Sequence, residues 1–236
     1  MENTLVMPKK YEAKEEKFMY ADGLPKISYS QYSSWNDPLY KNQYILGYMF
    51  GIPQPGNIFS DFGGYCGIFL ETGGEECHPS LTEETIATLR KIERPANAEY
   101  EKETVLVRET QYGSYSVQGF IDQTFDNEDG TTTVIDLKTG NPDSKIEYYG
   151  SKKYQQTTLY SYYLDTMENK KIGYSGVILA CRKGNGRGVH VLRLPGQLEH
   201  IPTPYSRERA ETFLLEVDRT VKEISDMYKV FLKVNN

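Results

Sequence analysis

The sequence predicts an α/β fold in which helices pack on a central β-sheet. Three observations lead to this prediction. The expected elements follow the order helix, three strands, helix, two strands, helix. Of the 236 residues, 38% are hydrophobic and 25% are charged, which is the balance of a chain that buries its own core. No Pro-, Gly- or Ser-rich linker interrupts residues 26–236, so we expect one domain there, after a loosely held arm over residues 1–25.

The first half of this domain is expected to be mainly helical. Ser30 is the predicted N-cap of a short helix that runs to Trp35. Residues 53–64 have the composition of a loop. The apolar residues 65–71 fit a helix or a strand equally well, whereas residues 82–92 have helical spacing.

The second half is expected to be rich in strands. Apolar and polar residues alternate over 115–125, and the turn DNEDG follows, so a hairpin can form with the next strand. The predicted elements are strands at 104–110, 115–125 and 132–138, a helix at 152–167, strands at 174–181 and 189–194, and a long amphipathic helix from Ala210.

Composition and charge exclude several classes of protein. No apolar run is long enough to span a bilayer, and the charged N-terminal residues lack the apolar core of a secretory signal. Three scattered cysteines suit a reducing compartment, so we expect a cytoplasmic protein without a membrane partner. The net charge of −6 argues against binding to nucleic acid by bulk positive charge, but allows contact through a metal ion and a local basic patch.

The segments that carry chemistry are GFID at 119–122 and VIDLKTG at 134–140. Residues two apart on a strand share a face, so Asp136 and Lys138 point to the same side, and in a hairpin Asp122 can converge with them. Two carboxylates with a free carbonyl suit a hard cation such as Mg²⁺, which polarises a phosphoryl oxygen and activates water. The alternative is a solvent-facing Asp-x-Lys pair, the common case for the bare tripeptide.

Two more features accompany these segments. Gln156 and Tyr160 are four residues apart and share a helical face, and Glu71 ends the stretch GGYCGIFLE. In order and spacing, GFID, VIDLKTG and QTTLY resemble the motifs of the RecB-like nucleases of the PD-(D/E)XK superfamily, with QTTLY as the family's Q-x-x-x-Y. The opening ISYSQYSSWNDPLY is similar to the start of that family. The resemblance runs from about Ile27 to Tyr163.

The resemblance implies a restriction-endonuclease-like core, with a central mixed sheet flanked by helices, and a cofactor of Mg²⁺ or Mn²⁺. It also assigns roles to individual residues. The implied residues are the metal ligands Asp122, Asp136 and the Leu137 carbonyl, Lys138 for positioning the attacking water, and Gln156 and Tyr160 for ordering the site and contacting substrate.

Two positions depart from the family pattern. The helix motif G-x-x-x-H-x-x-x-E has Gly67 in place of the histidine. Glu71, one helical turn further on, is expected to supply the missing oxygen ligand and is counted among the catalytic candidates. The first cysteine of the iron–sulfur relatives is replaced by Asp37 and no cysteine follows Cys181, so no Fe–S cluster is expected.

Basic residues near these motifs are candidates for contact with phosphate. Lys152 and Lys153 precede Gln156 and are expected to form a substrate-binding rim, with Arg182, Lys183 and Arg187 as a weaker second cluster. Ordinary solvated charge is the alternative for both. Cys77-His78 lacks a second ligand pair at zinc-finger spacing and is interpreted as loop.

The predicted function is a Mg²⁺-dependent deoxyribonuclease, with an exonuclease favoured over an endonuclease. It would act on single-stranded or end-containing DNA in recombination, repair or phage DNA processing, in the host cytoplasm if phage-encoded. A second hypothesis is a catalytically inactive nuclease-fold module for nucleic-acid binding or assembly, suggested by Gly67 and the acidic net charge. A third, an unrelated α/β domain, requires that Asp122, Asp136 and Lys138 do not converge.

Overall fold

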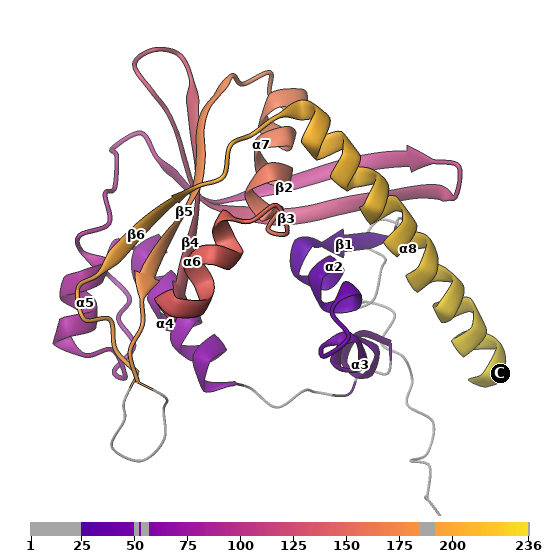
Figure 1. Cartoon of the computed structure of the whole chain (residues 1–236), viewed down its shortest axis with the longest axis horizontal. Coiled ribbons are helices and arrows are strands. Elements are labelled where there is room, and N and C mark those ends of the chain that lie inside the picture. The colour runs from indigo at the N-terminus through magenta and orange to yellow at the C-terminus, as the bar shows by residue number, and fades with distance from the viewer. Residues whose placement is uncertain (1–24, 50–51, 53–56, 185–191, 236) are drawn as a thin grey trace, which may run out of the picture. The chain divides into compact units, whose positions relative to one another are not determined.

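The strands of the described chain form one mixed sheet, in the order β1-β3-β4-β5-β6 with β2 paired to β3 (Figure 1). The computed structural model describes residues 25–49, 52, 57–184 and 192–235. Apart from residue 25, the predicted arm lies outside the described residues. Helices flank the sheet, so the predicted fold class, a central mixed sheet with flanking helices, is confirmed.

The elements have the following bounds. The strands are β1 (Lys26–Ser28), β2 (Glu99–Thr110), β3 (Gly113–Asp126), β4 (Thr132–Gly140), β5 (Ile172–Cys181) and β6 (Leu198–Pro202). The helices are α2 (Tyr29–Asn36), α3 (Lys41–Tyr44), the π-helix η1 (Ile45–Met49), α4 (Ile58–Glu71), α5 (Glu83–Leu89), α6 (Pro142–Gly150), α7 (Gln156–Met167) and α8 (Arg207–Asn235).

The chain divides into two compact units by its internal contacts. One unit contains Met1–Pro55, Val107–Gln118 and Leu214–Asn236, and the other contains Gly56–Leu106 and Gly119–Phe213. The expectation of a single domain over residues 26–236 stays a prediction. Every candidate site residue named above belongs to the second unit.

In the first unit, α2 begins with a capping box. The Ser28 hydroxyl accepts the Gln31 N–H at 3.2 Å, and the Gln31 side-chain oxygen accepts the Ser28 N–H at 2.7 Å. These reciprocal bonds satisfy two donors that a helix start leaves open. The predicted N-cap at Ser30 is therefore wrong by one half-turn, because only Ser28 has a glutamine three residues later.

A partly buried ion pair joins β2 to α8 in the same unit. Both carboxylate oxygens of Asp218 accept hydrogen bonds from Arg108, at 2.9 and 2.8 Å, and the Tyr115 hydroxyl donates a further bond of 2.5 Å. Burial alone would raise the pKa of Asp218, but these hydrogen bonds outweigh it and hold the pKa below its usual range. The bidentate geometry fixes the helix against the strand.

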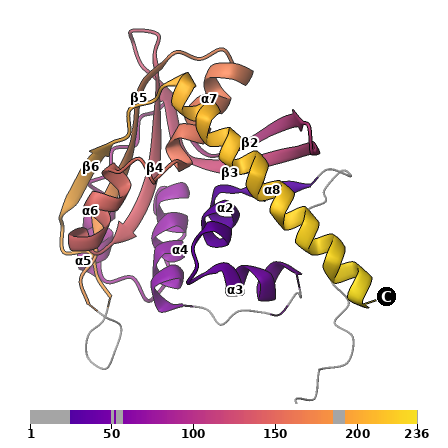
Figure 2. The same ribbon diagram turned by 45° about the vertical axis from the view of Figure 1, so that its right-hand side comes forward.

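Helices cover both faces of the sheet in the second unit (Figure 2). Ile135 of β4 packs with α4 and α5, whereas its neighbour Val134 packs with α7, as alternation along a strand requires. The buried residues on the α4–α5 side include Phe62, Cys66, Phe69, Leu70, Leu89, Ile135, Ile178 and Ala180. Those on the α7 side are Ile121, Val134, Tyr160 and Leu164.

Helix α4 replaces much of a predicted loop. The Asn57 side chain accepts hydrogen bonds from the N–H groups of Phe59 and Ser60, so the helix begins at Ile58. The loop expected over 53–64 is wrong from residue 58 onward, and residues 53–56 lie outside the described part. Glycines lower the helix propensity of this segment, but its apolar side chains are buried against the sheet, and that packing stabilises the helix.

Five described elements were not predicted: β1, α3 and η1 in the first unit, and α6 and β6 in the second. Helix α6 begins at Pro142 with Asn141 as its N-cap, and β6 pairs with β5 in antiparallel register. The strand expected at 189–194 lies partly outside the described residues, and Arg193 makes only an isolated bridge to Lys183. The long C-terminal helix is confirmed as α8. Within the described ranges, no helix has an apolar stretch long enough to cross a membrane.

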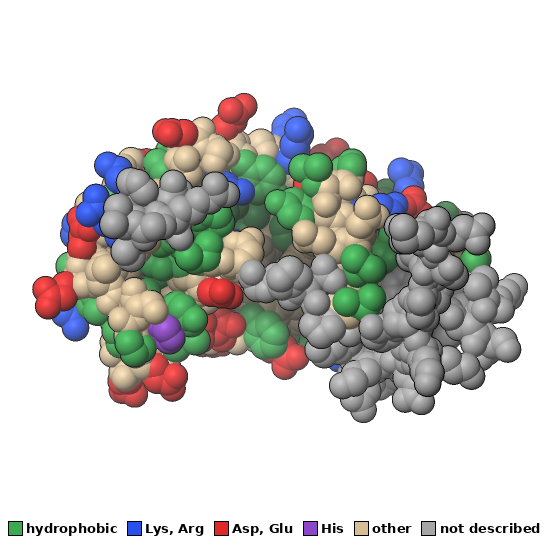
Figure 3. Space-filling view, turned by 90° about the horizontal axis from the view of Figure 1, so that it is seen from below, with side chains coloured by type: hydrophobic (Ala, Val, Ile, Leu, Met, Phe, Trp, Pro, Cys, Tyr) green, Lys and Arg blue, Asp and Glu red, His purple; other side chains and the backbone are tan. Residues whose placement is uncertain are grey.

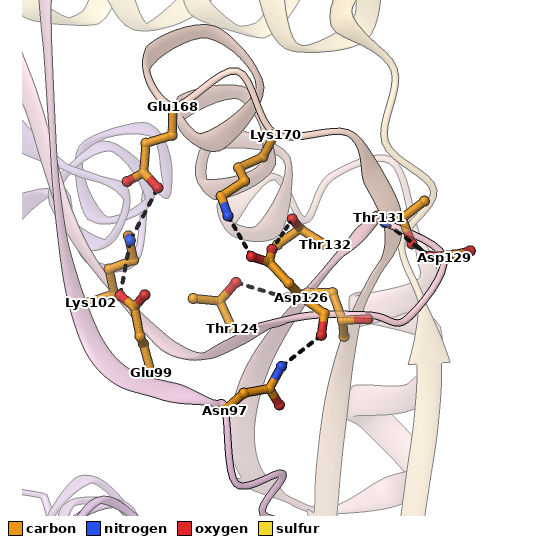
Figure 4. A network of polar contacts seen from close by, with 11 residues as sticks. Asn97, Glu99, Lys102, Thr124, Asp126, Asp129, Thr131, Thr132, Glu168 and Lys170 are labelled. Atoms are coloured by element: carbon orange, nitrogen blue, oxygen red, sulfur yellow. Dashed lines mark hydrogen bonds and ion pairs between the residues drawn. The ribbon is translucent and has the colours of Figure 1, made fainter.

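Polar contacts secure the turn end of the β3–β4 hairpin (Figure 4). Asp126, the last residue of β3, accepts hydrogen bonds from Lys170 at 2.6 Å and from Thr132 at 2.7 Å. Lys102 of β2 forms ion pairs with Glu99 at 2.9 Å and Glu168 at 3.1 Å. Exposed pairs of this kind contribute little energy each. The Thr132–Asp126 hydrogen bond joins two residues that are also partners across the hairpin, in the register that continues to the candidate site.

Candidate active site

The candidate site lies where strands β3 and β4 separate. Their antiparallel pairing ends at Gln123 and Ile135. Beyond it, the Asp122 carboxylate lies at the edge of β4 and accepts the N–H of Leu137 at 2.6 Å. The N–H and C=O of one strand residue point to the same side, so the Leu137 carbonyl faces the same gap. A carboxylate and a carbonyl thus lie together, as the sequence predicts.

Lys138 brings the two aspartates together. Its ammonium lies 2.7 Å from Oδ1 of Asp136 and 3.7 Å from Oδ2 of Asp122. Asp136 is fully buried, whereas about a fifth of the Asp122 side chain is exposed, 21%. Burial alone would lower the pKa of Lys138, but the two carboxylates outweigh it and raise that pKa, so the side chain is cationic. The predicted convergence of the three residues is observed.

A buried tyrosine joins these residues to α7. The Tyr154 hydroxyl donates to Oδ2 of Asp136 at 2.5 Å and lies 3.1 Å from the side-chain oxygen of Gln156. The Gln156 amide in turn donates to the Tyr160 hydroxyl at 2.7 Å. Gln156 and Tyr160 share a helical face, as predicted, and connect to Asp136 through Tyr154. Sequence reasoning missed Tyr154, because one tyrosine among 20 carries no motif of its own.

Gly119, the first residue of the GFID segment, makes room for Tyr160. A Cβ atom at this position would lie only 2.8 Å from a carbon of the Tyr160 ring. Any side chain there would displace the ring and the hydrogen bond that its hydroxyl accepts from Gln156. The glycine is therefore part of the packing that holds the site.

A cavity of about 320 Å³ opens beside these residues. It is lined on one side by one face of α4 and on the other by Asp122 and Lys138, with Glu71 and Glu101 also in its wall. Glu101 of β2 was not predicted. It has a φ of 49°, which is rare for a residue other than glycine. This backbone angle departs from regular strand geometry, on which the prediction of strand faces from sequence relies. In the left-hand part of Figure 3, acidic side chains (red) lie beside hydrophobic ones (green).

Glu71 lies against Gly67, the position at which the family has a histidine. Its Oε1 atom lies 3.4 Å from where a Cβ atom on Gly67 would be placed, so the glutamate folds back along α4 over that residue. Glu71 lies in the same cavity wall as Asp122 and Lys138. Its role as a metal ligand stays a prediction.

The electrostatics of the cavity favour a cation. Burial, and then repulsion from Asp136, raise the pKa of Asp122 to about 7, although Lys138 and the Leu137 N–H act in the opposite direction. Burial and the neighbouring Glu71 likewise raise the pKa of Glu101. One ammonium thus faces several carboxylates, and an added divalent cation would offset the excess negative charge.

The oxygen donors around the cavity are of the kind that a hard cation prefers, but they do not converge on one point. Oxygen donors are available from Asp122, Asp136 and the Leu137 carbonyl, with Glu71 and Glu101 across the cavity. Within the described residues, no three Asp, Glu, His or Cys side chains are close enough together to hold a metal ion. Asp136 instead has both oxygens engaged, by Lys138 and Tyr154. A cation bound to Asp136 would share its carboxylate oxygens with Lys138 and Tyr154.

Other predicted residues lie outside the cavity wall. Lys152 and Lys153 are exposed in the turn between α6 and α7 and do not line the cavity, so their substrate role stays a prediction. The His78 ring stacks on Tyr65, with ring centroids 3.6 Å apart, and its Nδ1 accepts the Ser80 N–H. This loop arrangement agrees with the interpretation of Cys77-His78 as structural.

Comparisons with known proteins identify the family. The sequence model of the PD-(D/E)XK nuclease superfamily matches residues 74–230. The solved structure titled "Crystal structure of SSO0001" has 15% identity and a TM-score of 0.46, over 90% of this chain and 79% of that one. No curated protein matches the chain. The family match includes Asp122, Asp136, Lys138, Gln156 and Tyr160, and it begins after Glu71.

Proposed function

Since this chain belongs to the PD-(D/E)XK nuclease superfamily, we propose that it is a metal-dependent deoxyribonuclease that hydrolyses phosphodiester bonds. The observation that carries the proposal is the contact of one half-buried lysine with two aspartates, at 2.7 and 3.7 Å, at the wall of an open cavity. A solvent-facing Asp-x-Lys pair, the alternative interpretation of the motif, does not have a fully buried aspartate.

The proposed ligands of Mg²⁺ or Mn²⁺ are Asp122, Asp136 and the Leu137 carbonyl, with Glu71 as a further oxygen donor. When bound, the cation would polarise the scissile phosphoryl group and make a bound water more acidic. Lys138 donates hydrogen bonds toward the attacking water and offsets charge that develops on the phosphate oxygens. Tyr154 holds Asp136 in place, the Gln156 side-chain oxygen lies against the Tyr154 hydroxyl, and Tyr160 accepts a hydrogen bond from the Gln156 amide.

Within this proposal we favour a RecB-like exonuclease that acts on DNA ends in recombination, repair or phage DNA processing. The motif order GFID, VIDLKTG and QTTLY supports the RecB-like subtype. The cavity supports action on an end or a single strand, because about 320 Å³ holds a nucleotide more readily than a duplex.

Closed and open DNA substrates test this proposal. The protein is incubated with linear duplex, nicked circle, closed circle and single-stranded DNA, each with Mg²⁺, with Mn²⁺ and with chelator. We expect linear and single-stranded DNA to be degraded only with a divalent cation, and closed circles to stay intact. Degradation with chelator would contradict metal dependence, and linearisation of closed circles would show an endonuclease.

A second candidate is a catalytically inactive module that binds nucleic acid. Two observations favour it: Gly67 stands where relatives have a histidine, and no three potential ligands are gathered in the described residues. Calorimetric titration with Mn²⁺ separates the two. Heat of binding that disappears in Asp136→Asn favours the nuclease, whereas binding of DNA ends without any Mn²⁺ binding favours the inactive module.

A further inference from the structure

A groove adjoins the active-site cavity at Phe59. It has a volume of about 880 Å³ and lies between the start of α4, the start of α6 and the end of β5. Phe59 lines both the groove and the cavity that contains Lys138. A polymer bound for cleavage must extend beyond the reacting phosphate, and this groove borders the cavity at the residue that the two share.

Phe59 and Arg182 form the centre of the groove. The Phe59 ring is 41% exposed, and the Arg182 guanidinium carbon lies 4.1 Å from its centroid. The Arg182 N–H donates to the Gly140 carbonyl at 2.7 Å, which extends the β4–β5 pairing by one step. Gly140 is two residues beyond Lys138 on β4, about 7 Å along the strand. The backbone bond thus places the residue that carries the guanidinium beside the candidate site.

The charge of the groove differs from that of the cavity. Its wall carries Arg182 and Lys183 against one carboxylate, Asp143, whereas the cavity wall has three carboxylates and one ammonium. A phosphate backbone suits such a positive groove, because arginine binds phosphate in a planar, bidentate geometry. An exposed aromatic ring next to it offers a surface on which an unpaired base stacks, independently of sequence.

We propose that this groove binds a single-stranded segment of the nucleic-acid substrate, with one base stacked on Phe59 and an adjacent phosphate on Arg182. The proposal rests on the proposed nuclease function and deepens it, because it places the strand that leads to the site. A base within a duplex is already stacked on its neighbours, so the groove discriminates in favour of unpaired ends.

Binding of a labelled oligothymidine to the full chain in chelator, followed by fluorescence anisotropy, tests the base contact without cleavage. Phe59→Leu keeps the apolar bulk but removes the aromatic face, and we expect it to weaken binding at least about fivefold. Phe59→Trp should bind as tightly as the unaltered protein or more tightly. Equal binding by the leucine and tryptophan variants would overturn the proposal.

The salt dependence of the same binding tests the phosphate contact. The binding constant K falls as salt is added, so the slope of log K against log salt is negative. Arg182→Gln should make this slope shallower by about 0.7, the value for one phosphate contact on a single strand. Arg90→Gln, an exposed arginine at the end of α5 that does not line the groove, is the matched control and should leave the slope unchanged. Equal slopes for the two variants would overturn the role of Arg182.

These results are distinguishable from failure of the nuclease function. Binding in chelator does not depend on catalysis, so a protein that cleaves DNA but binds oligothymidine equally in all variants contradicts the groove alone. Thermal unfolding of each variant checks that the substitutions have not disturbed the fold.

Discussion

The Tyr154 hydroxyl donates a 2.5 Å hydrogen bond to Oδ2 of Asp136, while the Lys138 ammonium contacts Oδ1 of the same carboxylate. Both Asp136 and Tyr154 are buried, with exposed fractions of 0% and 2%. A carboxylate held by a donor on each oxygen has a fixed orientation, which is what a reacting centre requires. Tyr154 therefore acts as a positioning residue for the candidate site.

Tyr154→Phe should lower kcat about 10- to 100-fold with little change in the KM for DNA, because Asp136 loses the donor that orients it. It should also lower the free energy of unfolding by about 1–3 kcal/mol, because a buried acceptor is left without its partner. Tyr148→Phe is the control. The Tyr148 ring packs edge-on against Tyr154, and this substitution keeps the ring while removing the hydroxyl. A matching fall in kcat for both variants would contradict the positioning role.

Asp122 makes stability depend on pH in the metal-free protein. Its pKa is about 7 in the folded state, because burial and Asp136 disfavour the charged form, against an ordinary value of 3.8. Between these values the folded state binds one more proton than the unfolded state, so stability falls as pH rises from about 4 to about 7. Asp122→Asn should remove this loss and raise the unfolding temperature at pH 8.

The measurement is thermal unfolding in chelator from pH 4 to 8, followed by the same series with Mn²⁺. Excess Mn²⁺ should restore stability at pH 8 in the unaltered protein but not in Asp122→Asn. Identical pH profiles for the two proteins in chelator would show that Asp122 does not carry the raised pKa.

Glu71 and Gly67 test how the missing histidine is compensated. If Glu71 supplies an oxygen ligand, Glu71→Gln should weaken Mn²⁺ binding by about tenfold or more, measured by calorimetry. Adding Gly67→His to that variant should restore part of the affinity, because the glutamate oxygen now lies 3.4 Å from the position of the new Cβ. Glu75→Gln, in the turn after α4, is the control. Unchanged Mn²⁺ affinity in Glu71→Gln would contradict a ligand role for Glu71 and leave Asp122 and Asp136 as the proposed carboxylate ligands.

The Arg108–Asp218 pair tests the stability of the first unit. Asp218→Asn should lower the free energy of unfolding by about 2 kcal/mol at neutral pH, since it leaves a half-buried guanidinium without its carboxylate partner. The pKa of Asp218 is lowered in the folded state, so its stabilisation is present above about pH 4 and is lost as pH falls further. Asp226→Asn, in an exposed i,i+4 pair of the same helix, should have almost no effect.

The site could be predicted from sequence wherever spacing alone determines geometry. The period of two along β4 places Asp136 with Lys138, and the turn DNEDG pairs that strand with β3, so convergence with Asp122 follows. The spacing of four likewise places Gln156 beside Tyr160.

The remainder depends on contacts that spacing does not encode. Tyr154 reaches Asp136 from the turn between two helices, and the positive φ of Glu101 departs from strand geometry. Helix α4 forms although glycines disfavour it, because its stability comes from burial against the sheet. Phe59 and Arg182 are far apart in the sequence and come into contact because α4 packs near the end of β5. Each of these depends on tertiary packing.

The most direct test of the account is the rate of DNA hydrolysis by Lys138→Ala in a single turnover, with excess protein and saturating Mg²⁺ or Mn²⁺. Lys138 is in contact with both Asp122 and Asp136. The account predicts a fall in rate of about 1,000-fold, because charge stabilisation at the reacting phosphate is lost, with DNA binding retained. Cleavage by Lys138→Ala at the rate of the unaltered protein would contradict it.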